Sequence, residues 1–585
     1  MKSELERLLA HALDTLTGSL LREAVDPASI QVERARDASH GDYASNIALR
    51  LAKSVGRAPR DIAQAIVDAL PPNPMVARAE VAGAGFINFY LPADAHGAVL
   101  QQVLEQGERF GHSSVGRGER VLLEFVSANP TGPLHVGHGR QAAYGASLGN
   151  LLRVTGHSVH REYYINDSGR QMDILAVSTW LRYLERGGAA LPFPSNGYRG
   201  DYVHAIAEQL ERRLGPELQR PVVAVLAQLP PDAPDGDKEQ HIDALIARMR
   251  TLLGDGGFDQ VLELALAVML ADIREDLAAF GVEFDRWYSE RELARSGAVE
   301  HALAELDARA ALYRKDGAVW FRASQYGDDE DRVLVRANGQ KTYFAPDIAY
   351  HLQKRERGFA RLIDVLGADH HGYVARVRGA LVAMGQPGDS LEACLMQFVS
   401  LFRGGQKIPM GKREAQFVTL RQLRDEVGND ACRFFYLMRS HDQQLDFDLE
   451  LAKSRTNDNP VFYIQYAHAR VASVMKQLES RHLQYDAATA VQHLGRLESP
   501  QEQAALRELA RYPEVVLQAA VARAPHMLVH YLRELANSFH SWYNAATFIV
   551  EDAPLRNARL ALALGVRQVI GNGLGLLGVS APDSM

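Results

Sequence analysis

Cysteine and long hydrophobic runs are scarce in this chain of 585 residues. Its two cysteines, Cys394 and Cys432, exclude a disulfide framework, and no CxxC pair is present to hold a structural metal. We therefore expect a reducing, cytoplasmic location. The most apolar windows, VLELALAVML and LALALGV, are far shorter than the about 20 residues that a membrane helix needs, so no membrane span is expected.

An excess of positive charge is also missing. The chain has 64 basic and 72 acidic side chains and a net charge of −8, which excludes binding of nucleic acid through overall charge alone. The balance changes along the chain, because the segment from Lys453 to the end carries 13 basic and 11 acidic side chains. This small surplus on an acidic body is compatible with an RNA partner at the C-terminal end.

Length and patterning divide the chain into several folded parts. At roughly 100–200 residues per domain, a chain of 585 residues predicts about three to five domains. Residues 1–92 are expected to form an α+β domain, with a helical hairpin followed by strands. Residues 118–450 predict a larger α/β domain with an insertion at about 187–259, and residues 451–585 predict an all-α bundle.

A strand, loop, helix, strand pattern begins at residue 120. RVLLEFVS (120–127) has the composition of a buried strand, the next loop holds Pro130 and Gly132, and a helix follows. Such a unit implies a parallel sheet, whose ligands bind beyond the carboxyl ends of the strands, where helix N-termini point. A second strand-to-helix crossing at 361–385 indicates a doubly wound, nucleotide-binding core.

Two histidines lie at the predicted start of that helix. His135 and His138 flank Gly137, and free backbone N–H groups at a helix N-terminus attract phosphate. Both imidazoles can donate to phosphoryl oxygens, and Gly137 allows a nucleotide to approach closely. Far downstream, a glycine-rich loop at 404–420 carries the basic side chains of Lys407, Lys412 and Arg413 before another helix, in reach of a leaving pyrophosphate.

These segments resemble known motifs. SANPTGPLHVGHGR (127–140) resembles the HIGH motif of class I aminoacyl-tRNA synthetases, and PMGKR (409–413) resembles a degenerate KMSKS loop. Within that class, the chain is similar to arginyl-tRNA synthetases over nearly its whole length. The further matching segments are YYINDSGRQ (163–171), TYFAPDIAYH (342–351), LGADHHGYVARV (366–377) and residues 430–470. The resemblance implies a multi-domain α/β protein: a Rossmann-type catalytic core between an N-terminal α+β domain that binds tRNA and a C-terminal anticodon-binding bundle.

The resemblance also implies an activity. It is the ligation of L-arginine to tRNA(Arg) through an arginyl-adenylate, with ATP and Mg²⁺ and without a structural metal. His135, His138 and Lys412 would be catalytic, although Pro409 and Gly411 replace the first lysine and the serine of KMSKS. The residues implied to bind ATP are Pro130, Gly132, His135, Gly137, His138, Gly367, Asp369, Met410, Lys412 and Arg413.

Arginine makes its own demand on the pocket. A planar guanidinium with five donors requires carboxylates and other acceptors in a fixed arrangement. The positions that match the family's arginine pocket are Glu124, Asn129, Tyr343, Asp347 and His371. On the bundle, Tyr463, Tyr466 and Arg470 are expected to hold anticodon bases, although a helix face of this content is as often part of a core. We expect a monomer without a membrane partner.

Three alternatives remain open at this stage. The histidines could form half of a metal site, completed by Asp369, His370 and His371, but no HExxH cluster is present. A small-molecule nucleotidyltransferase would share the HxGH helix but lack the last 130 or so residues. A catalytically silent relative that only binds RNA would fit the changes at Pro409 and Gly411.

Overall fold

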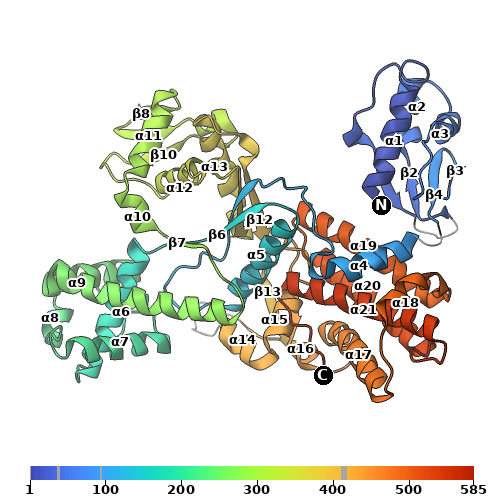
Figure 1. Ribbon diagram of the computed structural model, residues 1–585. Helices are drawn as coiled ribbons and strands as arrows, with labels where there is room; N and C mark the ends of the chain where they lie inside the picture. The colour runs from blue at the N-terminus through green and yellow to red at the C-terminus, as the bar shows by residue number, and fades with distance from the viewer. Residues whose placement is uncertain (1, 36–39, 93–94, 410–417) are drawn as a thin grey trace.

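The computed structural model describes residues 2–35, 40–92, 95–409 and 418–585. Figure 1 shows a small N-terminal domain, a central parallel sheet, a helical insertion and a C-terminal bundle. The predicted doubly wound core between an α+β domain and a helical bundle is confirmed.

The N-terminal domain is a four-stranded antiparallel sheet with helices. Its strand order is β1-β2-β4-β3. The predicted helical hairpin is wrong, because β1 and β2 lie between α1 and α2 in the chain. The domain contacts the bundle through Arg34 and Tyr43, which both bond to Glu514. The elements are α1 (Lys2–Leu16), β1 (Val32–Arg34), β2 (Tyr43–Ser45), α2 (Ile47–Val55), α3 (Pro59–Asp68), β3 (Arg78–Ala82) and β4 (Phe86–Tyr90).

The central sheet has five parallel strands in the order β12-β11-β5-β6-β7. These are β5 (Arg120–Glu124), β6 (Ser158–Ile165), β7 (Arg286–Ser289), β11 (Arg361–Gly367) and β12 (Leu391–Met396). The chain leaves β5 toward β6 on one side, while β11 lies on the other side, so the strand order reverses between β5 and β11. In doubly wound sheets ligands bind at this switch point, beyond the carboxyl ends of the strands.

Alternating side chains of the central strands face two different cores. Leu123 and Ile363 belong to the core that includes α5 (Val136–Val154), whereas Leu122 and Leu362 pack with α12 (Phe344–Glu356) on the other side. This follows from the period of two along a strand. The helix α13 (His371–Ala383) returns the chain from β11 to β12.

The insertion is helical and packs around its own core. A kink at Gly254, whose φ is 67°, divides its longest helix. The buried side chains of this part include Trp180 and Met249. The elements are α6 (Arg170–Arg186), α7 (Asp201–Leu214), α8 (Val222–Leu226) and α9 (Lys238–Ala279).

Two small sheets interrupt the α/β domain, and sequence patterning did not predict them. The first lies between β7 and α12, and the second flanks the KMSKS-like loop. The elements are α10 (Glu290–Arg295), α11 (Ala298–Ala308), β8 (Leu312–Lys315), β9 (Ala318–Phe321), β10 (Arg332–Val335), β13 (Val399–Arg403), β14 (Gln406–Lys407), α14 (Leu420–Val427), α15 (Asn429–Tyr436), β15 (Leu445–Asp448) and α16 (Leu449–Lys453).

The C-terminal bundle has well-capped helices. Asn459 caps α17 ahead of Pro460, and Ser499 forms a capping box with Glu502 at the start of α19. The helix α4 (Ala95–Gln106), although it precedes the core in the chain, also packs on this bundle. The bundle helices are α17 (Pro460–Ser480), α18 (Ala487–Gln492), α19 (Pro500–Val521), α20 (His526–Ala545) and α21 (Ala553–Leu577).

One apolar helix is longer than the sequence windows suggested. Within the described ranges, α21 alone has the length and the composition to cross a membrane, with 25 residues. The expectation that every apolar run is far too short was therefore wrong. In the structure, 61% of its most apolar window is buried, because its apolar side chains form the core of the bundle.

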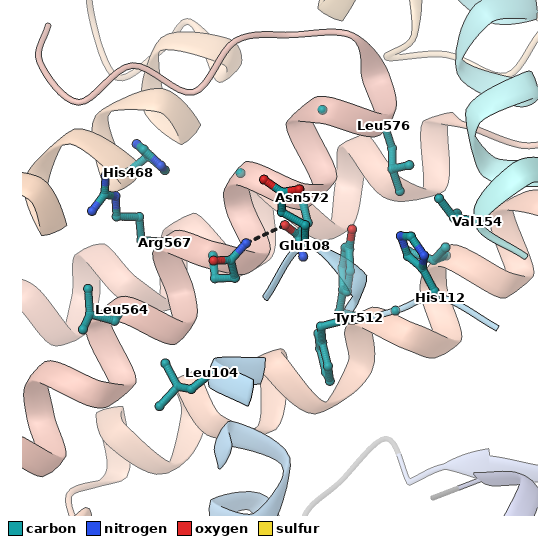
Figure 2. A pocket seen from close by; sticks show the side chains of 16 residues that line it. Leu104, Glu108, His112, Val154, His468, Tyr512, Leu564, Arg567, Asn572 and Leu576 are labelled. Atoms are coloured by element: carbon teal, nitrogen blue, oxygen red, sulfur yellow. Dashed lines mark hydrogen bonds between the residues drawn. The ribbon is translucent and has the colours of Figure 1, made fainter. Parts of the chain in front are cut away.

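A cavity of about 640 Å³ marks the junction of three parts of the chain. The end of α5, the segment after α4 and the helices α17, α19 and α21 all line it, as Figure 2 shows. Asn572 donates to the Gly107 carbonyl at 2.9 Å, which ties the bundle to the segment that leads into the core. The catalytic core and the bundle thus meet along α5.

Candidate active site

The candidate site lies at the switch point of the central sheet. Glu124 is the last residue of β5 and pairs in register with Asp364 of β11, while Gly367 ends β11. A loop leads from β5 to His135, which is the N-cap of α5. The residues predicted from the two halves of the core therefore meet at one edge of the sheet.

The two histidines cap the helix and each other. Gly137 and His138 donate their backbone N–H groups to Nδ1 of His135, at 3.0 and 3.4 Å, and His135 N–H donates to Nδ1 of His138 at 3.3 Å. The rings stack with their centroids 3.6 Å apart. A Cβ at Gly137 would lie 2.9 Å from the His135 ring, so glycine is required for this fold-back.

This arrangement corrects one prediction. The amides of Val136, Gly137 and His138 are already bonded, so they are not the free phosphate-binding groups that we expected. Because both Nδ1 atoms accept hydrogen bonds, the proton of each neutral ring lies on Nε2. In this tautomer the ring donor of each histidine is its Nε2–H group.

The segment that follows the KMSKS-like loop is anchored beside the same helix. Leu420 N–H donates to the Leu134 carbonyl at 2.8 Å, and Val136 N–H donates to the Val418 carbonyl at 3.3 Å. Segments nearly 300 residues apart are thereby paired as in a short antiparallel ladder. Lys407 lies in β14, just before the KMSKS-like loop in the chain. The predicted site residues Met410, Lys412 and Arg413, and Gly411, lie outside the described residues.

The other predicted ATP residues lie around the two strand ends. Pro130 is buried, and a Cβ at Gly132 would lie 3.4 Å from the Tyr202 hydroxyl. A Cβ at Gly367 would lie 2.4 Å from a carboxylate oxygen of Asp369, whose own side chain is exposed. Gly367 therefore has no room for a side chain beside Asp369, and Gly132 is close to Tyr202.

Two carboxylates lie close together without a basic partner. Burial raises the pKa of Asp347, in the first turn of α12, to about 6. Burial also raises the pKa of Glu290, the first residue of α10, and the neighbouring Asp347 charge adds to this. Within the described ranges, no lysine or arginine pairs with either one. A guanidinium entering between them would supply the missing positive charge.

Sequence reasoning identified Asp347 but missed Glu290, as well as the phenols of Tyr164 and Tyr373 beside these acids. Tyr373 contributes a hydrogen bond that lowers the pKa of Asp347 against the effect of burial. A usable signal was present, because Glu290 directly follows β7, and the carboxyl ends of parallel strands share one edge of the sheet.

The remaining predicted arginine residues are placed differently. Glu124 is buried and already paired with Lys354 at 2.6 Å. Asn129 is exposed and donates to Gln171 at 2.8 Å. Tyr343 precedes α12 with its side chain 77% exposed, so the structure does not bring it to the carboxylates. His371 begins α13, and its side chain lies outside the described part of the structure.

The predicted tRNA residues share one face of α17. Tyr463, Tyr466 and Arg470 are partly exposed. The Arg470 guanidinium lies 4.4 Å from the Tyr466 ring centroid and 4.6 Å from that of Tyr543 in α20. His468, on the opposite side of the helix, is buried and lines the junction cavity of Figure 2.

Comparison with known proteins gives matches along the chain. Family models for the arginyl-tRNA synthetase N-terminal domain, the class I tRNA synthetase (R) catalytic domain and the DALR anticodon-binding domain match residues 3–91, 99–187 and 464–585. The chain is 55% identical to the arginine–tRNA ligase of Thioalkalivibrio sulfidiphilus and 51% identical to that of Legionella pneumophila, over all of each chain. The chain belongs to the arginyl-tRNA synthetase family.

Solved structures of the family have the same fold. The Thermus thermophilus arginyl-tRNA synthetase is similar over all of both chains, with a TM-score of 0.76 and 25% identity. A putative arginyl-tRNA synthetase from Campylobacter jejuni gives a TM-score of 0.73 and 30% identity over 85% of this chain and all of that one. The family match includes the DALR model, so the C-terminal bundle is an anticodon-binding domain.

Proposed function

We propose that this member of the arginyl-tRNA synthetase family ligates L-arginine to tRNA(Arg) with consumption of ATP, at the edge of the sheet between β5 and β11. The observation that supports this proposal is that elements ending at this edge of the sheet carry three features together. These are the stacked histidine pair, the anchored segment after the KMSKS-like loop, and Asp347 and Glu290, which pair with no described lysine or arginine.

In the first step, a carboxylate oxygen of arginine attacks the α-phosphorus of ATP. A P–O bond forms, the bond to the β-phosphate oxygen breaks, and pyrophosphate leaves. His135 and His138 hold charge that develops on the phosphoryl oxygens through Nε2–H donors whose orientation the reciprocal caps fix. Lys412 neutralises the departing pyrophosphate. Mg²⁺ bound to ATP would supply further charge neutralisation.

In the second step, the 2′-hydroxyl of the terminal adenosine of tRNA attacks the arginyl carbonyl, and AMP leaves. Asp347 and Glu290 hold the guanidinium through both steps, so the reacting carboxyl group stays at the histidine end of the site. Asn129 and His371 contribute further contacts to arginine, and Gly367 and Asp369 contact ATP.

The tRNA contacts follow from the two flanking domains. Tyr463, Tyr466 and Arg470 stack on and hold anticodon bases, since aromatic rings and guanidinium planes are suited to unstacked bases. The N-terminal domain binds the tRNA elbow with its groove of about 500 Å³, which includes the exposed ring of Phe86. The protein acts as a cytoplasmic monomer.

Arginine-dependent exchange of pyrophosphate into ATP, with and without total tRNA, tests the proposal. Exchange with arginine and tRNA, and none with lysine or glutamine, is the expected result. Lys412→Ala should lower the rate by orders of magnitude and leave tRNA affinity nearly intact. A folded protein that binds tRNA but is silent in exchange would instead promote the RNA-binding alternative, with Pro409 and Gly411 as the disabling changes.

A further inference from the structure

Three acidic side chains lie side by side beneath the candidate arginine pocket. Glu162 of β6, Glu124 of β5 and Asp364 of β11 are in register across the three central strands. In-register neighbours of a parallel sheet project to the same face. The three residues are 0%, 8% and 4% exposed. Three buried like charges are unfavourable unless cations pair with them, so this row requires compensation.

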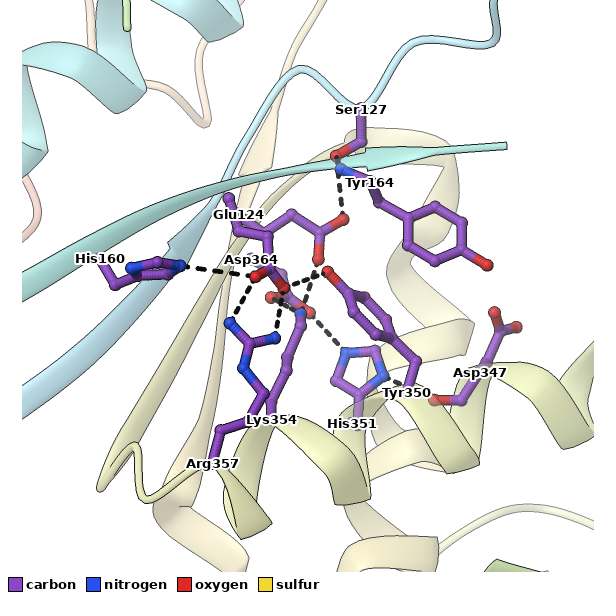
Figure 3. A network of polar contacts seen from close by, with 11 residues as sticks. Glu124, Ser127, His160, Tyr164, Asp347, Tyr350, His351, Lys354, Arg357 and Asp364 are labelled. Atoms are coloured by element: carbon purple, nitrogen blue, oxygen red, sulfur yellow. Dashed lines mark hydrogen bonds and ion pairs between the residues drawn. The ribbon is translucent and has the colours of Figure 1, made fainter. Parts of the chain in front are cut away.

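The helix α12 supplies that compensation, as Figure 3 shows. Lys354, which is 0% exposed, donates to Glu124 at 2.6 Å and to Asp364 at 3.0 Å. Arg357 pairs with both oxygens of Glu162. Against the effect of burial, Lys354 and its neighbour His351 hold the pKa of Asp364 well below its usual range. Asp364 and Glu124 in turn raise the pKa of Lys354 against burial. Asp364 and Lys354 are therefore both charged at neutral pH.

Glu124 contacts both the loop after β5 and the helix α12 through its two carboxylate oxygens. One accepts from the Ser127 hydroxyl at 3.0 Å, and the other accepts from Lys354. Ser127 and Val126 have φ values of 39° and 69°, a left-handed conformation that is unfavourable for a β-branched valine. Glu124 thus holds the strained start of the loop that leads to the histidines, and it holds α12, which carries Asp347 two turns before Lys354.

We propose that Lys354 is a positioning residue for arginine, through its fixed contact with Glu124. Its ammonium neutralises the acid row below the pocket and fixes α12 against β5 and β11. Asp347 and Glu290, which pair with no lysine or arginine among the described residues, are thereby held on elements that pack against the same strand ends. This inference rests on the proposed function.

Lys354→Met tests this role, with Arg559→Met as the matched control. Arg559 forms a comparable buried ion pair with Glu502 at 2.7 Å, but within the bundle. Both variants should lower Tm, since each leaves a buried carboxylate unpaired. Only Lys354→Met should raise the KM for arginine, by about tenfold or more, while the KM for ATP and the affinity for tRNA change less than about twofold.

A double variant distinguishes a loss of positioning from misfolding of the single variant. Lys354→Met combined with Asp364→Asn removes one cation and one acid together, which limits the buried charge imbalance. It should restore part of the lost Tm and keep the raised KM for arginine. Equal increases in the KM for arginine and for ATP, or an unchanged KM for arginine in the folded double variant, would overturn the inference. Loss of exchange in the wild-type chain would instead overturn the proposed function.

Discussion

The candidate active-site edge of the central sheet and the aromatic face of the bundle hold charged side chains in opposite surroundings. At the edge, Asp347 is buried enough for its pKa to rise, and the acids beneath it are paired inside the core. On the bundle, Arg470 lies over the partly exposed ring of Tyr466. The interaction energy of a charge is large where water is excluded and is screened by salt where it is not. Substitutions at the edge should therefore have large, pH-dependent effects, and those on the bundle small, salt-dependent ones.

The largest effect is expected at the histidine pair. His138→Asn retains a side chain that can accept the His135 N–H but loses the imidazole donor. The rate of pyrophosphate exchange should fall by about 100- to 1,000-fold, the range seen when one preorganised donor to a transition-state charge is removed. Single-turnover exchange with saturating arginine measures this. A change in KM alone, at an unchanged rate, would mean that His138 only binds ATP.

Asp347→Asn should come next. The KM for arginine should rise about 100-fold, because a partly buried charge partner of the guanidinium is lost. The free protein should become more stable at pH 7.5, because an ionised, partly buried carboxylate with a raised pKa opposes folding. Thermal melting checks this, with the exposed Asp329→Asn as the control. A lower Tm together with an unchanged KM would remove Asp347 from the pocket.

The pH dependence sharpens the comparison further. The titratable groups near Asp347 include Glu124, Glu290, His351, His370, Tyr164 and Tyr373. Burial raises the pKa of Asp347 to about 6 in the free protein. As pH falls through 6, Asp347 gains a proton, so kcat/KM for arginine should fall about tenfold per unit.

Stability should move in the opposite direction. Between about pH 4 and pH 6, the folded chain keeps a proton that the unfolded chain has released, so this contribution to stability is lost as pH rises. Asp347→Asn should abolish both dependences. Profiles that match the wild type in this variant would assign the titration to another group.

The smallest effect is expected on the bundle. Arg470→Gln should weaken tRNA binding by about fivefold at low salt and by less at high salt, because a partly exposed cation on RNA acts largely through counterion release. Filter binding over a salt series measures the slope, and Arg481→Gln, at the exposed residue that directly follows α17, serves as the control. An effect that does not change with salt would indicate a packing role for Arg470.

Sequence reasoning was most successful where a pattern is local. The strand at 120–124, the helix after His135 and the helical C-terminal part follow from the spacing of apolar residues and the positions of glycine and proline. The structure has all three. Sequence reasoning failed where the outcome depends on contacts between distant parts of the chain. Whether the amides of Gly137 and His138 face a ligand or the His135 ring depends on one rotamer. That Lys354 pairs with Glu124, 230 positions away, depends on the register of three strands.

The candidate arginine pocket also combines a residue from a local motif with one that only the tertiary fold brings there. Asp347 was found because its motif is continuous, whereas Glu290 belongs to a different segment that reaches the pocket only when β7 joins the sheet. Tyr343 has the expected position at the start of α12, but its side chain is exposed, since sequence spacing does not determine the direction of a side chain at a helix start.

The helix α5 extends from the histidine pair of the candidate active site to the bundle. Its 19 residues make it about 28 Å long, with the histidines at one end. Toward the other end, Ser147 and Asn150 donate to the carbonyls of Leu577 and Leu576, at the end of α21. Roughly 18 Å of helix separates this attachment from the histidine end, so a tilt of roughly 3° about it would move that end by about 1 Å. A displacement of 1 Å at reacting groups costs about 100-fold in rate. A small rotation of the end of α21 against α5 would therefore change the position of the histidine pair.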